Sequence, residues 1–313
     1  MIDKVFFDIT RFCNAECKYC FTNAVPYNDK NVNEELNIDE IVSFLNELAK
    51  NEIYKVSIGG GEPFLKNLEE IINRTNDKMK FSITTNGLII SDEFIKIFLN
   101  NKNIKVTISL DSLNNEKSNM VRKNIDINKV VSNIKKICEY EELRERLSIR
   151  TTISKVNYKD VYDIIDFCES NKIKNLKINS TNQFGRAKEN NELIIPFNEF
   201  MTFLKKLVTY CNENVKSLNV ELPVEKYLKG TNRKCLCGTT SLYVNWYGNI
   251  YPCAFTEGKI QLGNIKDKSV NKILNEISRF THDNKFCNEC PINRYKDYKK
   301  VTKEVTTWWV SYI

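Results

Sequence analysis

Hydrophobic and polar positions follow two alternating patterns through most of the first half of the chain. Short apolar runs typical of buried strands alternate with segments whose apolar residues recur every three or four positions, as in helices that face a core. The runs predict strands at 5–9, 54–58, 81–85, 104–110, 147–153 and 173–179, and the segments between them predict helices at 38–50, 68–73, 92–99, 127–140 and 161–170. Strands separated by helices favour an α/β fold with a parallel sheet, which either closes into a barrel or stays open.

The pattern changes after residue 187. A long helix is expected at 197–211, followed by an extended piece at 220–223. Two short strands at 241–246 and 249–251 flank Tyr247-Gly248 and predict a hairpin, and a last helix is expected at 270–278. We therefore divide the chain into a strand–helix domain at 1–190, a bridging helix and linker at 191–230, and a small domain at 231–313.

Composition and charge exclude several classes of protein. The 313 residues are 42% hydrophobic and 28% charged, as in soluble globular proteins. No apolar run is long enough to span a bilayer, and the start of the chain leads into a strand, so we expect a cytoplasmic protein without membrane contact. The net charge of +7 comes from lysines scattered among acidic residues, which argues against a nucleic-acid partner. The single histidine, His282, excludes multi-histidine metal sites.

The cysteines point to metal binding. A reducing compartment disfavours disulfides, and the eleven cysteines cluster towards the two ends of the chain. Cys13, Cys17 and Cys20 have the spacing Cys-x3-Cys-x2-Cys. Three thiolates leave one iron of an iron–sulfur cube open to a ligand that the protein does not supply. A zinc site completed by a distant ligand is the alternative.

This triplet, with the aromatic Tyr19 just before its last cysteine, resembles the signature of the radical S-adenosylmethionine (SAM) enzymes. The resemblance implies a partial (β/α)6 TIM-like barrel with its active site at the carboxyl ends of the strands. It also implies that the triplet holds a 4Fe-4S cluster whose open iron binds SAM. One electron, supplied by a partner such as flavodoxin or ferredoxin, then cleaves SAM to a 5′-deoxyadenosyl radical that removes a hydrogen from the substrate.

The residues that follow the predicted strands are unusual in the way that this barrel requires. Gly59-Gly60-Gly61-Glu62-Pro63 follows the second strand. Glycines expose backbone carbonyls and Glu62 adds an anionic acceptor, which together suit an ammonium group, although a tight turn would also use glycine. By resemblance, Gly60, Gly61 and Glu62 hold the amino group of SAM.

Later strands carry further candidates for cofactor binding. Ser109 and Asp111 resemble the family's contacts to the ribose and carboxylate of SAM, and Arg150 could pair with its carboxylate as a guanidinium fork. Tyr19 is expected to pack against adenine. In the alternative, Ser109 and Asp111 cap a turn and Arg150 faces solvent. A polar stretch at 114–128, with Arg122 and Lys123, is expected to be a solvated loop; in the alternative, these two residues face a substrate.

A second cysteine group lies in the C-terminal domain. Cys235 or Cys237, with Cys253, Cys287 and Cys290, supplies four thiolates for a closed iron–sulfur cluster or a zinc ion. Ten residues separate Cys237 from Gly248, and four more precede Cys253, a spacing that resembles the Twitch domain, the short form of the SPASM extension. No cysteine follows Cys290, so the resemblance implies one auxiliary 4Fe-4S cluster.

The remaining cysteines receive two different interpretations. The thiol of Cys235 or Cys237 that is left over is a candidate hydrogen-atom donor to a substrate radical. Cys138, Cys168 and Cys211 lie in helical patterns and are predicted to be small buried residues. The apolar segment 306–313 is expected to dock on the barrel.

The resemblance implies a radical SAM oxidoreductase that epimerises or cross-links a ribosomally made precursor peptide. Oxidation of a small molecule, such as an alcohol on an aminosugar, is the enzymatic alternative. A non-catalytic module with two zinc sites is the alternative from another class.

Overall fold

A computed structural model describes residues 2–27, 35–181, 184–222 and 237–277. Its centre is a ten-stranded sheet. In order across the sheet, the strands are β12 (Gly263–Asn264), β11 (Asn249–Tyr251), β10 (Ser241–Val244), β1 (Lys4–Thr10), β3 (Lys55–Gly60), β4 (Lys80–Thr85), β5 (Ile104–Ser109), β7 (Leu147–Ile153), β8 (Asn175–Ser180) and β9 (Asn219–Glu221). The strands from β10 to β9 are parallel to their neighbours, and β11 and β12 are antiparallel additions at one edge.

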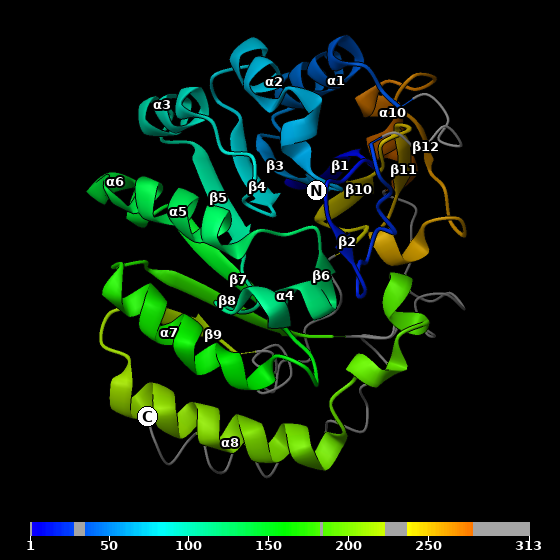
Figure 1. Ribbon diagram of the computed structural model, residues 1–313. Helices are drawn as coiled ribbons and strands as arrows, with labels where there is room; N and C mark the ends of the chain where they lie inside the picture. Colours follow the sequence, from blue (N-terminus) through cyan, green and yellow to red (C-terminus); the bar gives the residue numbers. More distant parts are fainter. Residues whose placement is uncertain (1, 28–34, 182–183, 223–236, 278–313) are drawn as a thin grey trace.

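Helices cover the outer face of the sheet, one after another, as Figure 1 shows. They are α1 (Ile38–Lys50), α2 (Leu68–Arg74), α3 (Asp92–Asn100), α5 (Ile127–Cys138), α6 (Glu141–Arg144), α7 (Val161–Ser170), α8 (Phe197–Asn214) and α10 (Val270–Ile277). The short α4 (Asn115–Val121) leads into β6 (Arg122–Lys123), which pairs with β2 (Glu16–Cys17) in a separate two-stranded sheet.

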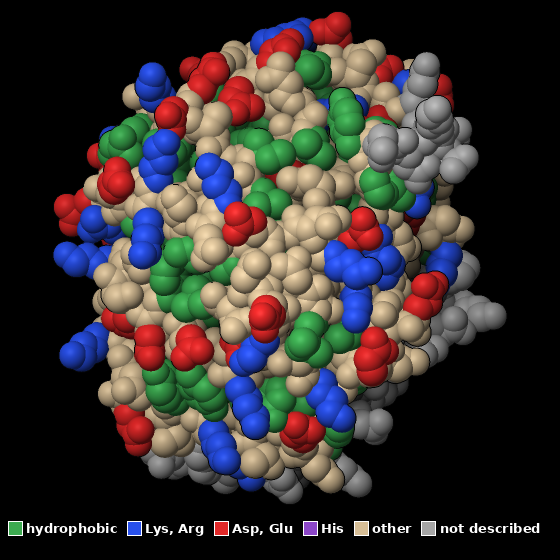
Figure 2. Space-filling view, in the orientation of Figure 1, with side chains coloured by type: hydrophobic (Ala, Val, Ile, Leu, Met, Phe, Trp, Pro, Cys, Tyr) green, Lys and Arg blue, Asp and Glu red, His purple; other side chains and the backbone are tan. Residues whose placement is uncertain are grey.

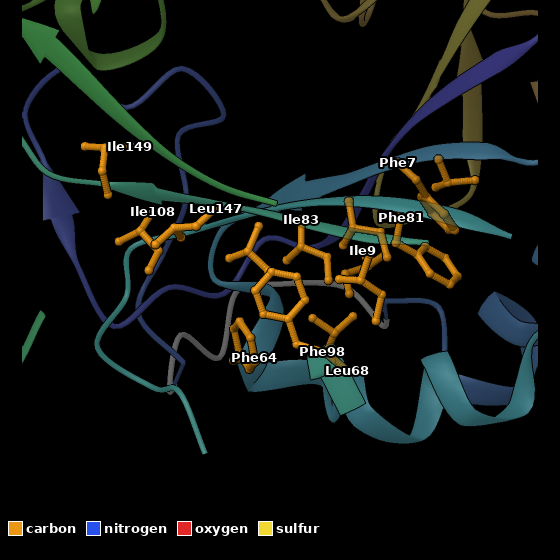
Figure 3. Packing of buried hydrophobic residues seen from close by; sticks show 14 of the residues in the cluster. Phe7, Ile9, Phe64, Leu68, Phe81, Ile83, Phe98, Ile108, Leu147 and Ile149 are labelled. Carbon is orange, nitrogen blue, oxygen red and sulfur yellow. The ribbon is translucent and has the colours of Figure 1, made fainter. Parts of the chain in front are cut away.

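The hydrophobic core lies between the sheet and these helices. In Figure 3, Phe7, Ile9, Phe81 and Ile83 of the strands pack with Leu68 and Phe98 of the helices. Side chains of a strand alternate between faces, so the opposite face of the same strands carries mainly polar residues. On β7, for example, Ile149 and Thr151 are fully buried, whereas Arg150 and Thr152 remain partly exposed. The inner face of the sheet is therefore available for chemistry.

The structure confirms the parallel α/β fold and all six strands predicted for the first half of the chain, with ends that differ by a few residues. The helix expected at 127–140 is α5, which ends at Cys138, and the short α6 follows it as an element that was not predicted. The hairpin is present, and its first strand pairs in parallel with β1. This long-range pairing, and the addition of β9 beside β8, could not be read from local periodicity.

The expectation for the stretch 114–128 was wrong. It contains α4 and β6, and Arg122 is only 2% exposed, because its guanidinium lies under the cysteine loop. Lys123, the next residue, is exposed as expected. Of the helical cysteines, Cys138 and Cys168 are buried and Cys211 is half-buried. Cys235, Cys287, Cys290 and the segment 306–313 lie outside the described residues.

In the described part of the chain, no helix has both the length and the apolar character needed to cross a membrane. On the face seen in Figure 2, Lys and Arg side chains are interspersed with Asp and Glu.

Candidate active site

The cysteine loop follows β1 and forms one side of a cavity of about 410 Å³ at the carboxyl ends of the strands. Cys13, Cys17 and Cys20 all line it. The backbone of the loop is fixed at several points: the N–H of Cys13 donates to the carbonyl of Val25 at 2.8 Å, and the Glu16–Cys17 strand pairs with β6. The structure thus brings the three predicted thiols to one cavity.

The environment of these thiols determines their protonation. Burial raises the pKa of Cys13 to about 12 and also raises that of Cys17. They therefore stay protonated at neutral pH unless a metal ion stabilises the thiolates. Backbone N–H groups of Ala15 and Ala24 lie 3.4 Å from the sulfurs of Cys13 and Cys20. Such donors are a known means of tuning iron–sulfur clusters.

The glycine turn after β3 lies directly against the cysteine loop. A Cβ atom at Gly61 would be 2.0 Å from the carbonyl oxygen of Phe12, and one at Gly60 would be 2.3 Å from that of Thr10. The N–H of Gly61 donates to the Thr10 carbonyl at 2.7 Å. Glycine is needed here because two backbones meet without room for a side chain. Gly60 and Gly61 also line the cavity, where the predicted contact with SAM would be made.

Glu62 occupies a different position from the one that its predicted role suggests. It is fully buried and is not among the cavity-lining residues. Its carboxylate accepts hydrogen bonds from the Thr85 hydroxyl at 2.7 Å and from the N–H of Asn86 at 2.8 Å. Burial raises its pKa to about 7. In this structure Glu62 joins the turns after β3 and β4, and its contact with the amino group of SAM stays a prediction.

Under the cysteine loop, buried polar groups connect it to β5. The hydroxyl of Tyr19 donates to the Asp111 carboxylate, and Nη1 of Arg122 donates to the Ser109 carbonyl at 2.7 Å. Burial raises the pKa of Asp111, although Nε of Arg122 lies 3.8 Å from its carboxylate. Arg122 also hydrogen-bonds the Cys17 thiol.

These groups do not all face the cavity. Tyr19, Ser109 and Arg122 line it, whereas Asp111 does not. Asp111 therefore organises the wall of the cavity from behind. The predicted contacts of Tyr19, Ser109 and Asp111 with SAM stay predictions.

Arg150 also lines the cavity. It lies between Ser109 and Lys177 in the sheet register, and its Nε is buried without a hydrogen-bond partner among the described residues. A buried guanidinium nitrogen without an acceptor is costly, so an anionic ligand would be stabilised there. The contact of Arg150 with the carboxylate of SAM stays a prediction.

A second turn, after β8, holds the opposite side of the cysteine loop. A Cβ atom at Gly185, which has a φ of +52°, would lie 2.1 Å from the Cys20 carbonyl oxygen. Nε and Nη1 of Arg186 donate to the carbonyls of Cys17 and Ala24 at 2.8 and 2.6 Å. Both residues belong to the 3₁₀ turn η3 (Gly185–Lys188). Sequence reasoning assigned them no role, although their place after a strand was the available signal.

The second cysteine group is partly described. Cys237 hydrogen-bonds Cys253 and thereby lowers the pKa of the Cys253 thiol to about 6. The contact favours Cys237 as a ligand beside Cys253 and leaves Cys235 as the candidate hydrogen donor; both assignments stay predictions. Next to Cys253, Phe255 packs against Phe21 and Phe184 at 5.2 and 4.7 Å between ring centres. This aromatic cluster connects the second cysteine region to the first.

The residues present fit the cofactors that the sequence implies. Three cysteines, two glycines of the turn after β3 and Arg150 line one cavity. Its volume is in the range of pockets that bind small cofactors. An iron–sulfur cluster and a ligand with ammonium and carboxylate groups match this set of donors.

Comparison with known proteins gives the family. The radical SAM superfamily model matches residues 7–168, so the chain belongs to the radical SAM superfamily. The iron–sulfur cluster-binding SPASM domain matches residues 235–291, which places the chain among the members with this extension. Iron–sulfur clusters and SAM are its cofactors.

Two curated relatives differ in how much of the chain they match. A probable GTP 3′,8-cyclase of Methanocaldococcus jannaschii is 32% identical over 163 residues, 51% of this chain and 53% of that protein. The antilisterial bacteriocin subtilosin biosynthesis protein AlbA of Bacillus subtilis is 23% identical over 273 residues, 86% of this chain and 58% of that protein. The chain thus spans about half the length of these relatives.

Solved structures confirm the fold. Streptococcus suis SuiB bound to its precursor peptide SuiA is similar with a TM-score of 0.71 and 18% identity, covering 94% of this chain and 70% of SuiB. The enzyme anSMEcpe with bound AdoMet and a Cp18Cys peptide is similar with a TM-score of 0.65 and 20% identity, covering 93% of this chain and 86% of that one.

Proposed function

We propose that this protein modifies a ribosomally made precursor peptide, by epimerisation or cross-linking. The likeness to AlbA, a bacteriocin biosynthesis protein, carries the proposal, because it extends over 86% of the chain. The structural likeness to SuiB with its precursor peptide supports it.

The residues of the cavity support this chemistry by binding and positioning. Cys13, Cys17 and Cys20 would hold the cluster, and Gly60, Gly61 and Arg150 would orient SAM. When bound, the cluster and SAM supply the radical that removes a substrate hydrogen. Cys237 and Cys253, with Cys287 and Cys290, would hold an auxiliary cluster. The buried Tyr19–Asp111–Arg122 contacts keep the wall of the cavity rigid.

The cellular setting is part of the proposal. The eight described cysteines form no disulfide with one another, and thiols stay reduced in the cytoplasm, where a flavodoxin or ferredoxin could supply the electron. We therefore propose a cytoplasmic enzyme with such a reducing partner.

The number of clusters can be measured first. After anaerobic reconstitution, iron and sulfide per chain are compared between the wild type and a variant in which Cys13, Cys17 and Cys20 are replaced by alanine. We expect about eight irons to fall to about four, with release of 5′-deoxyadenosine abolished. A wild type without iron or SAM cleavage would contradict the enzyme assignment and favour zinc.

The substrate is then tested with synthetic peptides in deuterium oxide and, in parallel, with GTP and an aminosugar. A gain of a single deuterium in a peptide means epimerisation, and the loss of a hydrogen pair means a cross-link. Conversion of GTP or the aminosugar, with all peptides unchanged, would contradict the proposal.

A further inference from the structure

Three polar residues outside the predicted site form a cluster where the barrel meets the C-terminal region. The hydroxyl of Tyr243, on β10, lies 2.9 Å from Oδ2 of Asp8, on β1. It also lies 3.5 Å from Oε2 of Glu257, which follows the 3₁₀ turn η5 (Ala254–Thr256). Asn245 holds Glu257 in place by donating to its other oxygen, Oε1, at 2.7 Å.

Asp8 lies beside the cavity: it is not itself among the residues that line it, but it is partly exposed and adjoins one that does. Its neighbours Phe7 and Ile9 are buried in the core, so Asp8 is on the inner face of the sheet. There it is paired with Gly59, which lines the cavity. A Cβ atom at Gly59 would be 3.1 Å from Oδ1 of Asp8, so the glycine leaves room for this carboxylate. Tyr243 donates to Oδ2, and among the described residues no hydrogen bond to Oδ1 is observed.

The Tyr243 hydroxyl lies within 3.5 Å of two carboxylates but has a single proton to donate. Tyr243 has one hydroxyl proton, and the shorter contact gives it to Asp8. The longer contact to Glu257 is a hydrogen bond only when Glu257 carries a proton or when the Tyr243 hydroxyl turns towards it. The three side chains are therefore arranged to move a proton between Asp8, on the inner face of the sheet, and Glu257, and both carboxylates are partly exposed.

Electrostatics agree with this arrangement. Burial raises the pKa of Asp8 to about 7; the hydrogen bond from Tyr243 opposes this and the charge of Glu257 adds to it. Tyr251 of β11 also faces Glu257. Among the described residues, no basic side chain contributes to the shift of Asp8. A carboxyl group that titrates near neutral pH suits a general base.

We propose that Asp8, Tyr243 and Glu257 form a proton relay, in which Asp8 accepts a proton from a substrate group that reaches past Gly59 to its Oδ1 atom. The O–H bond on Asp8 forms as the substrate's bond to that hydrogen breaks, and the electron pair stays on the substrate. Asp8 then passes its proton to the Tyr243 oxygen while the Tyr243 hydroxyl gives its own to Glu257, which releases it to solvent. The relay rests on the proposed function for its substrate.

The test uses reconstituted holoenzyme and a peptide that the experiment above shows to be modified. Wild-type product formation should rise with pH through about 7, because Asp8 must be deprotonated. Asp8→Asn should lower product formation about 100-fold or more. Tyr243→Phe should move the rise to higher pH, because the carboxylate loses its hydrogen bond. Glu257→Gln should slow product formation because the relay loses its last acceptor.

The control is Tyr158→Phe, which removes a similar Tyr–carboxylate bond, 2.8 Å long, to Glu199 on α8. It should leave the pH profile unchanged. Release of 5′-deoxyadenosine without peptide should be equal in all variants. If Asp8→Asn keeps the wild-type rate and profile, the relay is wrong. If it loses 5′-deoxyadenosine release, Asp8 belongs to cofactor binding and the relay is equally wrong.

Failure of the proposed function can be distinguished from failure of the relay. If no peptide is modified, infrared titration of holoenzyme with ¹³C-labelled aspartate still tests the proton site. A labelled carboxyl that titrates near neutral pH in the wild type, moves in Tyr243→Phe and is absent in Asp8→Asn supports the cluster. Its absence from the wild type overturns the cluster.

Discussion

The cysteine loop is held by two turns, one after β3 and one after β8, that act by different physical means. After β3, the backbone of Gly60 and Gly61 meets the backbone of the loop directly. After β8, Gly185 makes a similar close approach, but the side chain of Arg186 reaches across to two loop carbonyls. The first turn depends on the absence of side chains, whereas the second depends on one long charged side chain.

The largest effect is expected when the first contact is broken. Gly61→Ala would place a Cβ atom 2.0 Å from the Phe12 carbonyl oxygen, a backbone atom that cannot move freely. We expect a loss of about 3 kcal/mol or more in the free energy of unfolding, at the upper end of overpacking costs. Chemical denaturation and iron per chain after reconstitution would measure it.

Gly258→Ala is the control, because a Cβ atom there meets nothing within 4 Å. Its φ of +72° still carries backbone strain, of about 1–2 kcal/mol. If Gly61→Ala is no more harmful than this control, the close approach of the two backbones does not limit stability.

A second difference between the turns concerns pH. The turn after β3 contains Glu62, whose pKa rises from 4.5 to about 7 on folding because the carboxyl group is buried. The folded protein holds the Glu62 proton more tightly than the unfolded chain, so stability should fall as pH rises from about 4.5 to about 7.

Urea unfolding at several pH values in this window would measure the slope in the wild type, in Glu62→Gln and in Arg186→Gln. Glu62→Gln should flatten the slope, and Arg186→Gln should keep it. Asp8, whose pKa burial also raises to about 7, adds to the slope but is common to all three proteins. Equal slopes in the wild type and Glu62→Gln would contradict the assignment.

Removing the guanidinium of the second turn should have a smaller effect. Arg186→Gln leaves the Cys17 and Ala24 carbonyls without their donors, which costs about 2 kcal/mol for charged hydrogen bonds. We also expect faster loss of iron to a chelator. Arg144→Gln is the matched control, since Arg144 donates to a backbone carbonyl, that of Cys138, far from the cavity. Equal rates of iron loss in the two variants would rule out a specific role for Arg186.

The smallest effect concerns the aromatic cluster between the two cysteine regions. Phe255→Leu removes ring contacts with Phe21 and Phe184 but keeps an apolar side chain. We expect a loss of about 1 kcal/mol, the value of aromatic pairs beyond burial. Thermal unfolding would measure it, with Tyr162→Leu, which lies in another aromatic group on α7, as a control. A change in the iron content of the first cysteine site would show that the aromatic cluster has a role beyond packing.

The strands, the helices and the glycine turn after β3 could be predicted from the sequence. The role of the turn after β8 could not. Alternating periods predicted the parallel strands, and the glycine run has a local signature. The contacts of Arg186 join residues 162 or more positions apart, which no local pattern encodes. The prediction for Arg122 was wrong for a similar reason. A charged side chain favours solvent, and only the folded structure brings the Ser109 carbonyl and the Asp111 carboxylate to its guanidinium. Glu62 was predicted as a ligand, and its bonds to the β4 turn became visible only in three dimensions.

The parallel pairing of β10 with β1 also has a consequence for how the chain is made. On the ribosome, β1 emerges first, and its β3 neighbour follows within about fifty residues, since β3 begins at Lys55. The other edge of β1 waits for residues 241–244. Until then the nascent chain displays an unpaired strand edge that other chains can join. Chains released before residue 241 should therefore aggregate more readily than those that have completed this strand.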